Sequence, residues 1–214
     1  MEDAAANTVK SGTTTIALLC KDGIIMAADR RATAGGMIVD KKAKKIHPIA
    51  KKTVLTTSGS VSDLQLLVKL ITAELSLKRY RTELESTTEE AANLLASLVY
   101  SNVRNFSLIP GITHFLLGGH DSEGYHVYDI FVDGSISIIE DYDSSGSGSV
   151  FAMGVLEALY RPGMPAREAV DLVKKALTAA LRRDSYSGEG FDIILITQDG
   201  IKELESKELK VDLS

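Results

Sequence analysis

The sequence has few of the residues that cross-link, break or anchor a chain, and each shortage excludes a class of protein. One cysteine, Cys20, among 214 residues cannot form an internal disulfide or a cysteine-rich metal site. Four prolines and 17 glycines are too few for a flexible linker. No apolar run approaches the ~18 residues that a membrane-spanning helix needs, and residues 1–12, MEDAAANTVKSG, lack the apolar stretch of a secretory signal. We therefore expect a soluble, cytoplasmic protein with no membrane partner.

What remains is the composition of an ordinary globular domain. Hydrophobic residues make up 44% of the chain, charged residues 25%, and the net charge is −5. Apart from the run KKAKK at 41–45, no dense group of lysines and arginines is present, so nucleic acid is not an expected partner. The four histidines do not have metal-site spacing. We expect one domain with no metal and no cofactor.

Hydrophobic periodicity predicts groups of strands that alternate with pairs of helices. Apolar, β-branched runs joined by Asp-Gly turns predict hairpins. Apolar residues spaced three and four apart predict the helices, with Ser62 or Asp63 as the first N-cap, a capping box at Thr87, and Pro110 at or beyond the second helix end. The predicted strands are 13–20, 24–29, 53–59, 113–119, 125–131, 135–140, 191–197 and 201–205. The predicted helices run from 62 to about 80, from 87, over 150–160, and from Pro165 through 180.

This order of elements predicts an α+β fold. A doubly wound sheet would alternate single strands with single helices, and this chain does not. Strands that arrive as hairpins form antiparallel sheets, and strands this apolar need cover on both faces. We predict a four-layer α-β-β-α sandwich, in which two antiparallel sheets pack together and a helix pair covers each from outside.

The junction of Gly12 and Thr13 suggests a specific chemistry. If residues 1–12 are removed, Thr13 carries a hydroxyl and a free α-amine on one residue. An α-amine has a pKa of about 7.7–8.0, so it is partly neutral in a cell and can accept the hydroxyl proton. By itself, however, the threonine run 13–15 is better explained as the start of a β-branched strand.

Six segments carry further motifs: GTTT (12–15), KDGIIMAADRRATAG (21–35), AKKI (43–46), SGSVSDLQLL (58–67), SSGSGSVFAMGVLE (144–157) and RRDSYSGEGFDI (182–193). In order and spacing, over essentially all of residues 12–197, they resemble the β-type subunits of the proteasome core particle, closest to the archaeal form. Those subunits belong to the N-terminal-nucleophile hydrolases. The fold that this resemblance implies is the same four-layer sandwich, so the two arguments agree.

The resemblance implies that the chain is made as a precursor. Residues 1–12 would be a propeptide, removed by autocatalytic cleavage between Gly12 and Thr13, and residues 13–214 would form one peptidase domain. Thr13 would then be the N-terminal nucleophile of a threonine endopeptidase.

The same resemblance implies roles for six further residues. Lys45 corresponds to an essential lysine, whose ammonium lowers the cost of forming the threonine alkoxide, and Asp29 to the carboxylate that holds it. Without the family register, Lys45 is one charge in a solvated run. Gly59 corresponds to the residue whose N–H faces the tetrahedral oxygen. The polar cluster around the terminal amine corresponds to Ser147, Asp184 and Ser187.

A pocket for the side chain before the scissile bond is also implied. Thr33 and Gly59 would pair with the substrate backbone as an added strand. Thr57, at the pocket floor, departs from the larger apolar residue expected there, and no strongly charged group replaces it. We predict a preference for apolar or small side chains. The implied lining residues are Ala32, Thr33, Ala43, His47, Thr57 and Val61.

Assembly follows from the resemblance alone. Such subunits form seven-membered β rings stacked between rings of α-type subunits, and a regulatory ATPase feeds unfolded protein substrates through the α ring into a closed chamber. Two alternatives stay open: an unprocessed or inactive structural β-ring subunit, and a standalone amidase of the same superfamily. All the residues that the mechanism needs are present, which favours the active subunit.

Overall fold

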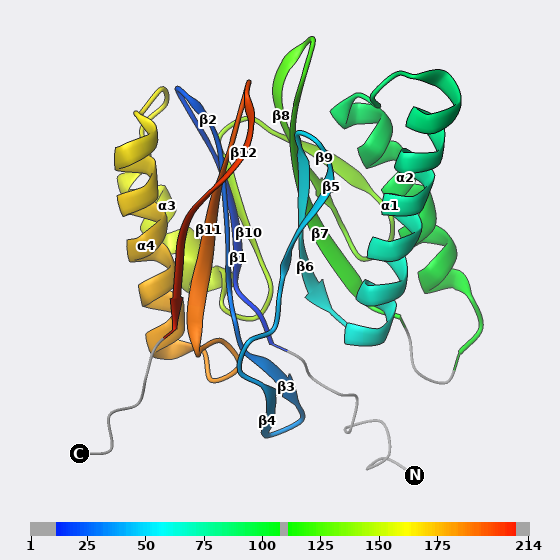
Figure 1. Ribbon diagram of the computed structural model, residues 1–214. Helices are drawn as coiled ribbons and strands as arrows, with labels where there is room; N and C mark the ends of the chain where they lie inside the picture. The colour runs from blue at the N-terminus through cyan, green and yellow to red at the C-terminus, as the bar shows by residue number, and fades with distance from the viewer. Residues whose placement is uncertain (1–11, 108–110, 209–214) are drawn as a thin grey trace.

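Two antiparallel sheets lie face to face in the computed structural model, with a pair of helices outside each (Figure 1). The structure describes residues 12–107 and 111–208. The sheets have five strands each, in the orders β10-β1-β2-β11-β12 and β5-β6-β7-β8-β9. The predicted four-layer α-β-β-α sandwich is confirmed.

The first sheet joins the N-terminal strands to the C-terminal hairpin. Its helices, α3 and α4, bury an apolar stripe that includes Val173 and Leu177 against Ile16 and Ile25. The strands are β1 (Thr15–Cys20), β2 (Gly23–Asp29), β10 (Tyr142–Ser145), β11 (Gly190–Thr197) and β12 (Gly200–Glu208), and the helices are α3 (Ser149–Leu159) and α4 (Ala166–Arg183).

The second sheet comes from the middle of the chain. Leu67 and Ile71 of α1 and Leu95 of α2 pack on Leu55 and Phe115 of its strands. The strands are β5 (Ile46–Ala50), β6 (Thr53–Gly59), β7 (Thr113–Asp121), β8 (Gly124–Ile130) and β9 (Ile136–Ile139), and the helices are α1 (Val61–Thr82) and α2 (Thr88–Arg104).

The alternation of side chains along each strand explains why the strands are apolar throughout. In β2, Ile25 faces the helices, whereas Ile24 and Met26 face Val54 and Leu116 of the other sheet. Burying one such side chain stabilises the fold by roughly 1.5–3 kcal/mol. The same packing holds the two sheets together and fixes how their strand ends meet.

Helix starts were predicted with mixed success. Thr87 forms the predicted capping box with Glu90 at the start of α2. The prediction for α1 was wrong: the helix begins at Val61 with Ser60 as N-cap, and Asp63 lies in its first turn, where it accepts a hydrogen bond from the Ser60 hydroxyl. Pro165 is the N-cap of α4 and directly precedes its first turn. Pro110 lies outside the described residues.

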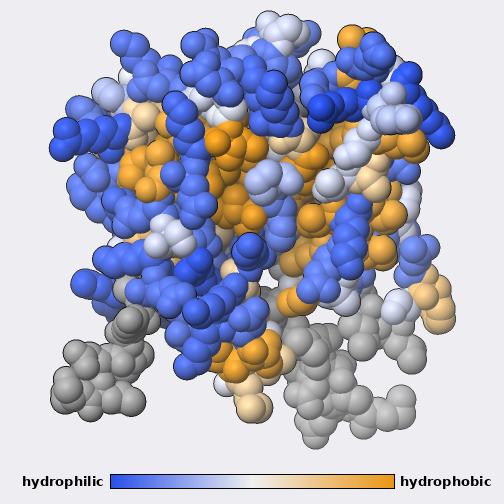
Figure 2. Space-filling model, in the orientation of Figure 1, coloured by the Kyte–Doolittle hydropathy of each residue, from blue (hydrophilic) through white to orange (hydrophobic). Residues whose placement is uncertain are grey.

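Hydrophobic periodicity did not predict four short strands, which are β3 (Ala32–Ala34), β4 (Met37–Asp40), β5 and β10. β3 and β4 pair only with each other and project from one end of the sandwich (Figure 1). Figure 2 shows an apolar patch at this end, to which the exposed Met37, Ile38 and Val39 belong. No helix within residues 12–107 and 111–208 is long and apolar enough to cross a membrane.

Candidate active site

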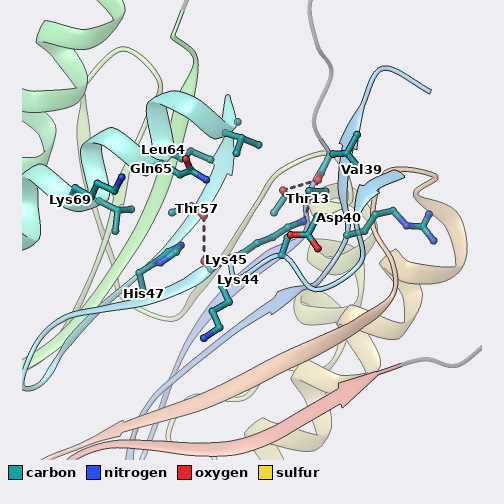
Figure 3. A pocket seen from close by; sticks show the side chains of 17 residues that line it. Thr13, Val39, Asp40, Lys44, Lys45, His47, Thr57, Leu64, Gln65 and Lys69 are labelled. Carbon is teal, nitrogen blue, oxygen red and sulfur yellow. Dashed lines mark hydrogen bonds between the residues drawn. The ribbon is translucent and has the colours of Figure 1, made fainter. Parts of the chain in front are cut away.

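The predicted catalytic residues come together at one end of the sandwich, where strand ends from both sheets meet. Thr13 lies two residues before the start of β1, and Asp29 is the last residue of β2. Lys45 directly precedes β5, and Gly59 is the last residue of β6 in the other sheet. Thr13 and Lys45 face the same pocket, as Figure 3 shows.

A buried ion pair anchors the site. The carboxylate of Asp29 has no exposed surface, and its Oδ1 accepts hydrogen bonds from Lys45 Nζ at 2.7 Å and from the Thr14 backbone N–H at 2.9 Å. Its Oδ2 accepts from the backbone N–H groups of Arg31 and Gly188, each at 3.0 Å. Three backbone donors therefore fix the carboxylate, and the carboxylate fixes the lysine.

The hydroxyl and the ammonium converge on one carbonyl. Thr13 Oγ1 donates to the Gly12 carbonyl oxygen at 2.8 Å, and Lys45 Nζ donates to the same oxygen at 3.3 Å. Burial lowers the pKa of Lys45 below its usual range, an effect that the Asp29 carboxylate partly opposes. A cation held at the peptide bond beside a hydroxyl stabilises negative charge that develops on that carbonyl oxygen.

The serine–aspartate cluster surrounds the backbone nitrogen of Thr13. That N–H donates to Ser147 Oγ at 3.3 Å, and Ser147 Oγ donates to Asp184 Oδ2 at 2.6 Å. Ser187 Oγ donates to the same Asp184 oxygen at 2.6 Å and lies 2.7 Å from the Thr14 hydroxyl. All three residues implied by the family resemblance are therefore in one hydrogen-bonded chain that ends at the Thr13 nitrogen.

Gly12 lies in a narrow space beside Tyr186, a contact that the sequence did not predict. A Cβ added at Gly12 would lie 1.7 Å from Cβ of Tyr186 and 2.8 Å from Ser147 Oγ. The Gly12 N–H donates to Thr33 Oγ1 at 3.2 Å. Tyr186 had no signal of its own in the sequence, because an aromatic residue between serines in a loop has no periodicity that would place it.

Gly59 is required by backbone geometry. Its φ of 122° is strained for any other residue, and an added Cβ would lie 2.2 Å from the carbonyl oxygen of Ile112. Gly59 lines the pocket together with Thr13. The structure thus places Gly59 and the predicted nucleophile on the lining of one pocket.

A pocket of about 450 Å³ opens beside Thr13, between β5, β6 and the start of α1. Five of the six predicted lining residues line it, and the sixth, Thr33, is buried and holds Gly12. The prediction missed the face of α1 that closes the pocket. Leu64, Gln65, Val68 and Lys69 lie on this face, together with Val61, because they are spaced as neighbours on a helix surface.

The groups available for chemistry here are a hydroxyl, an ammonium, two carboxylates and backbone N–H groups. Within residues 12–107 and 111–208, no three His, Cys, Asp or Glu side chains are grouped so that they could hold a metal ion.

Comparison with known proteins agrees with this geometry. Residues 9–196 match the family of proteasome subunits. The proteasome subunit beta of Archaeoglobus profundus is 42% identical over 207 residues, which cover 96% of this chain and 94% of that protein. That of Ferroglobus placidus is 42% identical over 206 residues, or 96% of each chain. That of Methanocaldococcus fervens is 40% identical over 203 residues, covering 94% and 89%. This chain therefore belongs to the proteasome subunit family and is similar over nearly all of its length to archaeal β subunits.

Proposed function

We propose that this chain is a catalytic β-type subunit of the proteasome core particle, an N-terminal threonine endopeptidase that hydrolyses unfolded proteins. The single observation that carries the proposal is the convergence of Thr13 Oγ1 and Lys45 Nζ on the Gly12 carbonyl oxygen. A structural subunit has no need of a hydroxyl, a buried ammonium and its carboxylate around one peptide bond.

The first reaction is cleavage of the chain by itself. Thr13 Oγ attacks the carbonyl carbon of Gly12, the C–N bond between the two residues breaks, and the hydroxyl proton passes to the departing nitrogen. The product is an ester of Gly12 on Thr13 Oγ. Water hydrolyses this ester, which releases residues 1–12 with a carboxylate at Gly12 and leaves Thr13 with a free hydroxyl and a free α-amine.

The second reaction is peptide hydrolysis by the same group. The free amine of Thr13 takes the hydroxyl proton while Oγ attacks a substrate carbonyl, and the Thr13 ammonium so formed protonates the leaving amine as the peptide C–N bond breaks. Water then hydrolyses the ester on Thr13 Oγ, which releases the new carboxyl end of the substrate and restores the Thr13 hydroxyl. Lys45, held by Asp29, stabilises the alkoxide, and the Gly59 N–H stabilises the tetrahedral oxygen. Ser147, Asp184 and Ser187 hold the amine and its water.

The proposed setting is the cytoplasm and a closed particle. The chain would form a seven-membered ring with other β subunits, stacked against rings of α-type subunits, with the nucleophiles facing the inner chamber. A regulatory ATPase would feed unfolded substrates through the α ring. Enclosure of this kind confines a sequence-tolerant peptidase to chains that have already been unfolded.

The deciding experiment is the intact mass of the chain before and after co-assembly with α-type subunits. The proposal expects loss of residues 1–12 in assembled particles, together with hydrolysis of fluorogenic peptides, and neither in particles built with Thr13→Ala. Assembled particles that keep residues 1–12 and do not cleave peptides would instead identify a structural ring subunit. Full peptide hydrolysis with residues 1–12 still attached would rule out the amine mechanism.

A further inference from the structure

The inner wall of the pocket is polar, although most of its lining is apolar. Lys45, which directly precedes β5, and His47, the second residue of β5, both line the pocket. On the neighbouring strand, the Thr57 N–H donates to the Lys45 carbonyl at 3.0 Å. Figure 3 shows the His47 ring turned toward Thr57, with α1 on the other side of the space.

Both side chains on this wall offer hydrogen-bond acceptors. The Thr57 hydroxyl donates its hydrogen to the Lys45 carbonyl at 3.5 Å, so its lone pairs remain for a ligand. Burial lowers the pKa of His47, and its ring is hydrogen-bonded to the Lys44 backbone. A neutral imidazole has one donor and one acceptor nitrogen, and the Lys44 carbonyl takes the donor. A side chain that brings a hydrogen-bond donor therefore finds acceptors on this wall.

The other walls decide which donor fits. Val61, Leu64 and Val68 give the pocket an apolar side against α1, which suits an apolar body. Two of the cations in the lining have carboxylate partners behind it, Lys45 with Asp29 and Arg31 with Glu189, so the charges set against the Asp40 carboxylate are those of Lys44 and Lys69. This excess of positive charge opposes a lysine or arginine of the substrate. The group that combines an apolar body with a neutral donor at its far end is the phenol of tyrosine.

We infer that His47 and Thr57 make this pocket selective for tyrosine over phenylalanine at the residue before the scissile bond. The inference rests on the proposed peptidase function and adds to it a preference for cleavage after tyrosine over phenylalanine. In the proposed complex, the apolar ring lies against α1 and the phenolic O–H donates to His47 Nδ1 or Nε2 or to Thr57 Oγ1. His47 and Thr57 act here as specificity-determining residues.

The matched substrates are three fluorogenic peptides that differ only at that residue: tyrosine, phenylalanine and O-methyltyrosine. A net hydrogen bond in a partly exposed pocket changes an equilibrium by about threefold to tenfold. We expect kcat/KM for the tyrosine peptide to exceed that for phenylalanine by this factor. O-methyltyrosine keeps the oxygen but has no donor, so we expect it to be no better than phenylalanine.

Two pairs of variants test whether His47 and Thr57 cause the selectivity. His47→Phe and Thr57→Val remove an acceptor at nearly constant volume, and each should bring the tyrosine-to-phenylalanine ratio toward one. His47→Gln and Thr57→Ser keep an acceptor and should preserve much of the ratio. A ratio that stays unchanged in both His47→Phe and Thr57→Val would overturn the assignment to these residues.

The three wild-type rates decide the inference even if a variant does not assemble. Equal rates for tyrosine and phenylalanine, or a tyrosine rate matched by O-methyltyrosine, would overturn it. That result differs from a failure of the proposed function, because Thr13→Ala particles supply the background rate. If no peptide is cleaved above this background, the peptidase proposal itself fails. If cleavage depends on Thr13 but is equally fast for the tyrosine and phenylalanine peptides, the peptidase proposal stands and only the inferred selectivity is wrong.

Discussion

The two sides of the candidate site are built differently. On the catalytic side, Asp29 is fully buried and accepts four hydrogen bonds, and Asp184 joins two serines to the Thr13 nitrogen. On the pocket side, Val61 and Val39 are 46% and 61% exposed, and together with Leu64 and Val68 they give the pocket an apolar surface. One side is a hydrogen-bonded network, and the other is a surface shaped by packing.

This contrast suggests how each side responds to substitution. In a network, a change at one residue leaves buried partners unsatisfied, so its effect spreads to the whole cluster. In a packed surface, a change alters shape or charge locally and leaves the neighbouring walls in place. Substitutions on the catalytic side should therefore affect both cleavage of the chain and peptide turnover, whereas substitutions in the pocket should affect only the choice of substrate.

The largest expected effect is that of Thr13→Ala. Removing Oγ removes the only attacking atom proposed for both reactions, so residues 1–12 should be retained and peptide turnover should fall to background. Thr13→Ser keeps the oxygen and should retain part of both activities. Intact mass and fluorogenic peptide assays of assembled particles measure the two outcomes. Complete processing of Thr13→Ala would identify another nucleophile.

Lys45→Ala should come close to the same loss. It removes the ammonium that lies 3.3 Å from the Gly12 carbonyl oxygen and leaves the buried Asp29 carboxylate without its partner. Loss of one electrostatic donor at a reacting oxygen costs about 10²–10³ in kcat. Lys42, which is 72% exposed in the same basic run and pairs with Glu208, offers a control: Lys42→Ala should process normally. Equal defects in both variants would contradict a specific role for Lys45.

The network side was also the predictable side. Its residues occur in short segments whose order and spacing resemble a known family, and each segment includes the start or the end of a strand or helix, where periodicity changes. The sandwich followed from the same periodicity, since β2 is apolar on both faces and α4 has one apolar stripe. Local pattern and tertiary structure agree wherever a segment is buried.

The pocket side was predictable only in part. Leu64 and Val68 were expected as core residues of a helix, and nothing in the sequence says that this helix lies over β5 and β6. β3 has only three residues and β4 is exposed along its length, so hydrophobic alternation does not mark them. Tyr186 acts through its backbone-proximal atoms against Gly12, a contact that depends on how two distant loops meet. Such features belong to tertiary placement and leave no periodic signal.

Asp29→Asn tests the network through the pH profile. Burial lowers the pKa of Lys45, and the Asp29 carboxylate is the largest influence that raises it. A neutral amide removes that influence, so the pKa should fall further and the lysine should lose its proton at lower pH. If activity requires the charged lysine, the alkaline limb of kcat/KM should move to lower pH in Asp29→Asn. An unmoved limb, measured with one peptide in both particles, would show that Lys45 does not control it.

Gly12→Ala should slow processing and leave turnover by processed chains unchanged, because residue 12 is absent after cleavage. The added Cβ would collide with Tyr186 Cβ unless the loop moves, so the scissile carbonyl would shift from Thr13 and Lys45. We expect the processing rate of Gly12→Ala to be lower by about tenfold or more, as measured by intact mass over time.

A second substitution tests the cause. Because the collision involves Tyr186 Cβ, Tyr186→Gly in the Gly12→Ala chain should recover part of the processing rate, and Tyr186→Ala should not. Equal rescue by both would place the conflict at the aromatic ring instead.

The smallest expected effect is on the pocket side of the site, at Lys69. Lys69 lies on the pocket face of α1 and is solvent-exposed, so its charge acts on a substrate side chain through partly screened water. Lys69→Glu should raise cleavage after arginine relative to aspartate by about twofold to fivefold, the range of an exposed charge pair, and added salt should reduce the change. Lys69→Gln should give an intermediate ratio.

Processing at Gly12 should keep its normal rate in both variants. Among the hydrogen bonds and ion pairs of residues 12–107 and 111–208, none joins Lys69 to the clusters around Asp29 and Asp184. A processing defect as large as the change in selectivity would mean that the pocket and the network are one coupled unit, and the contrast between them would fail.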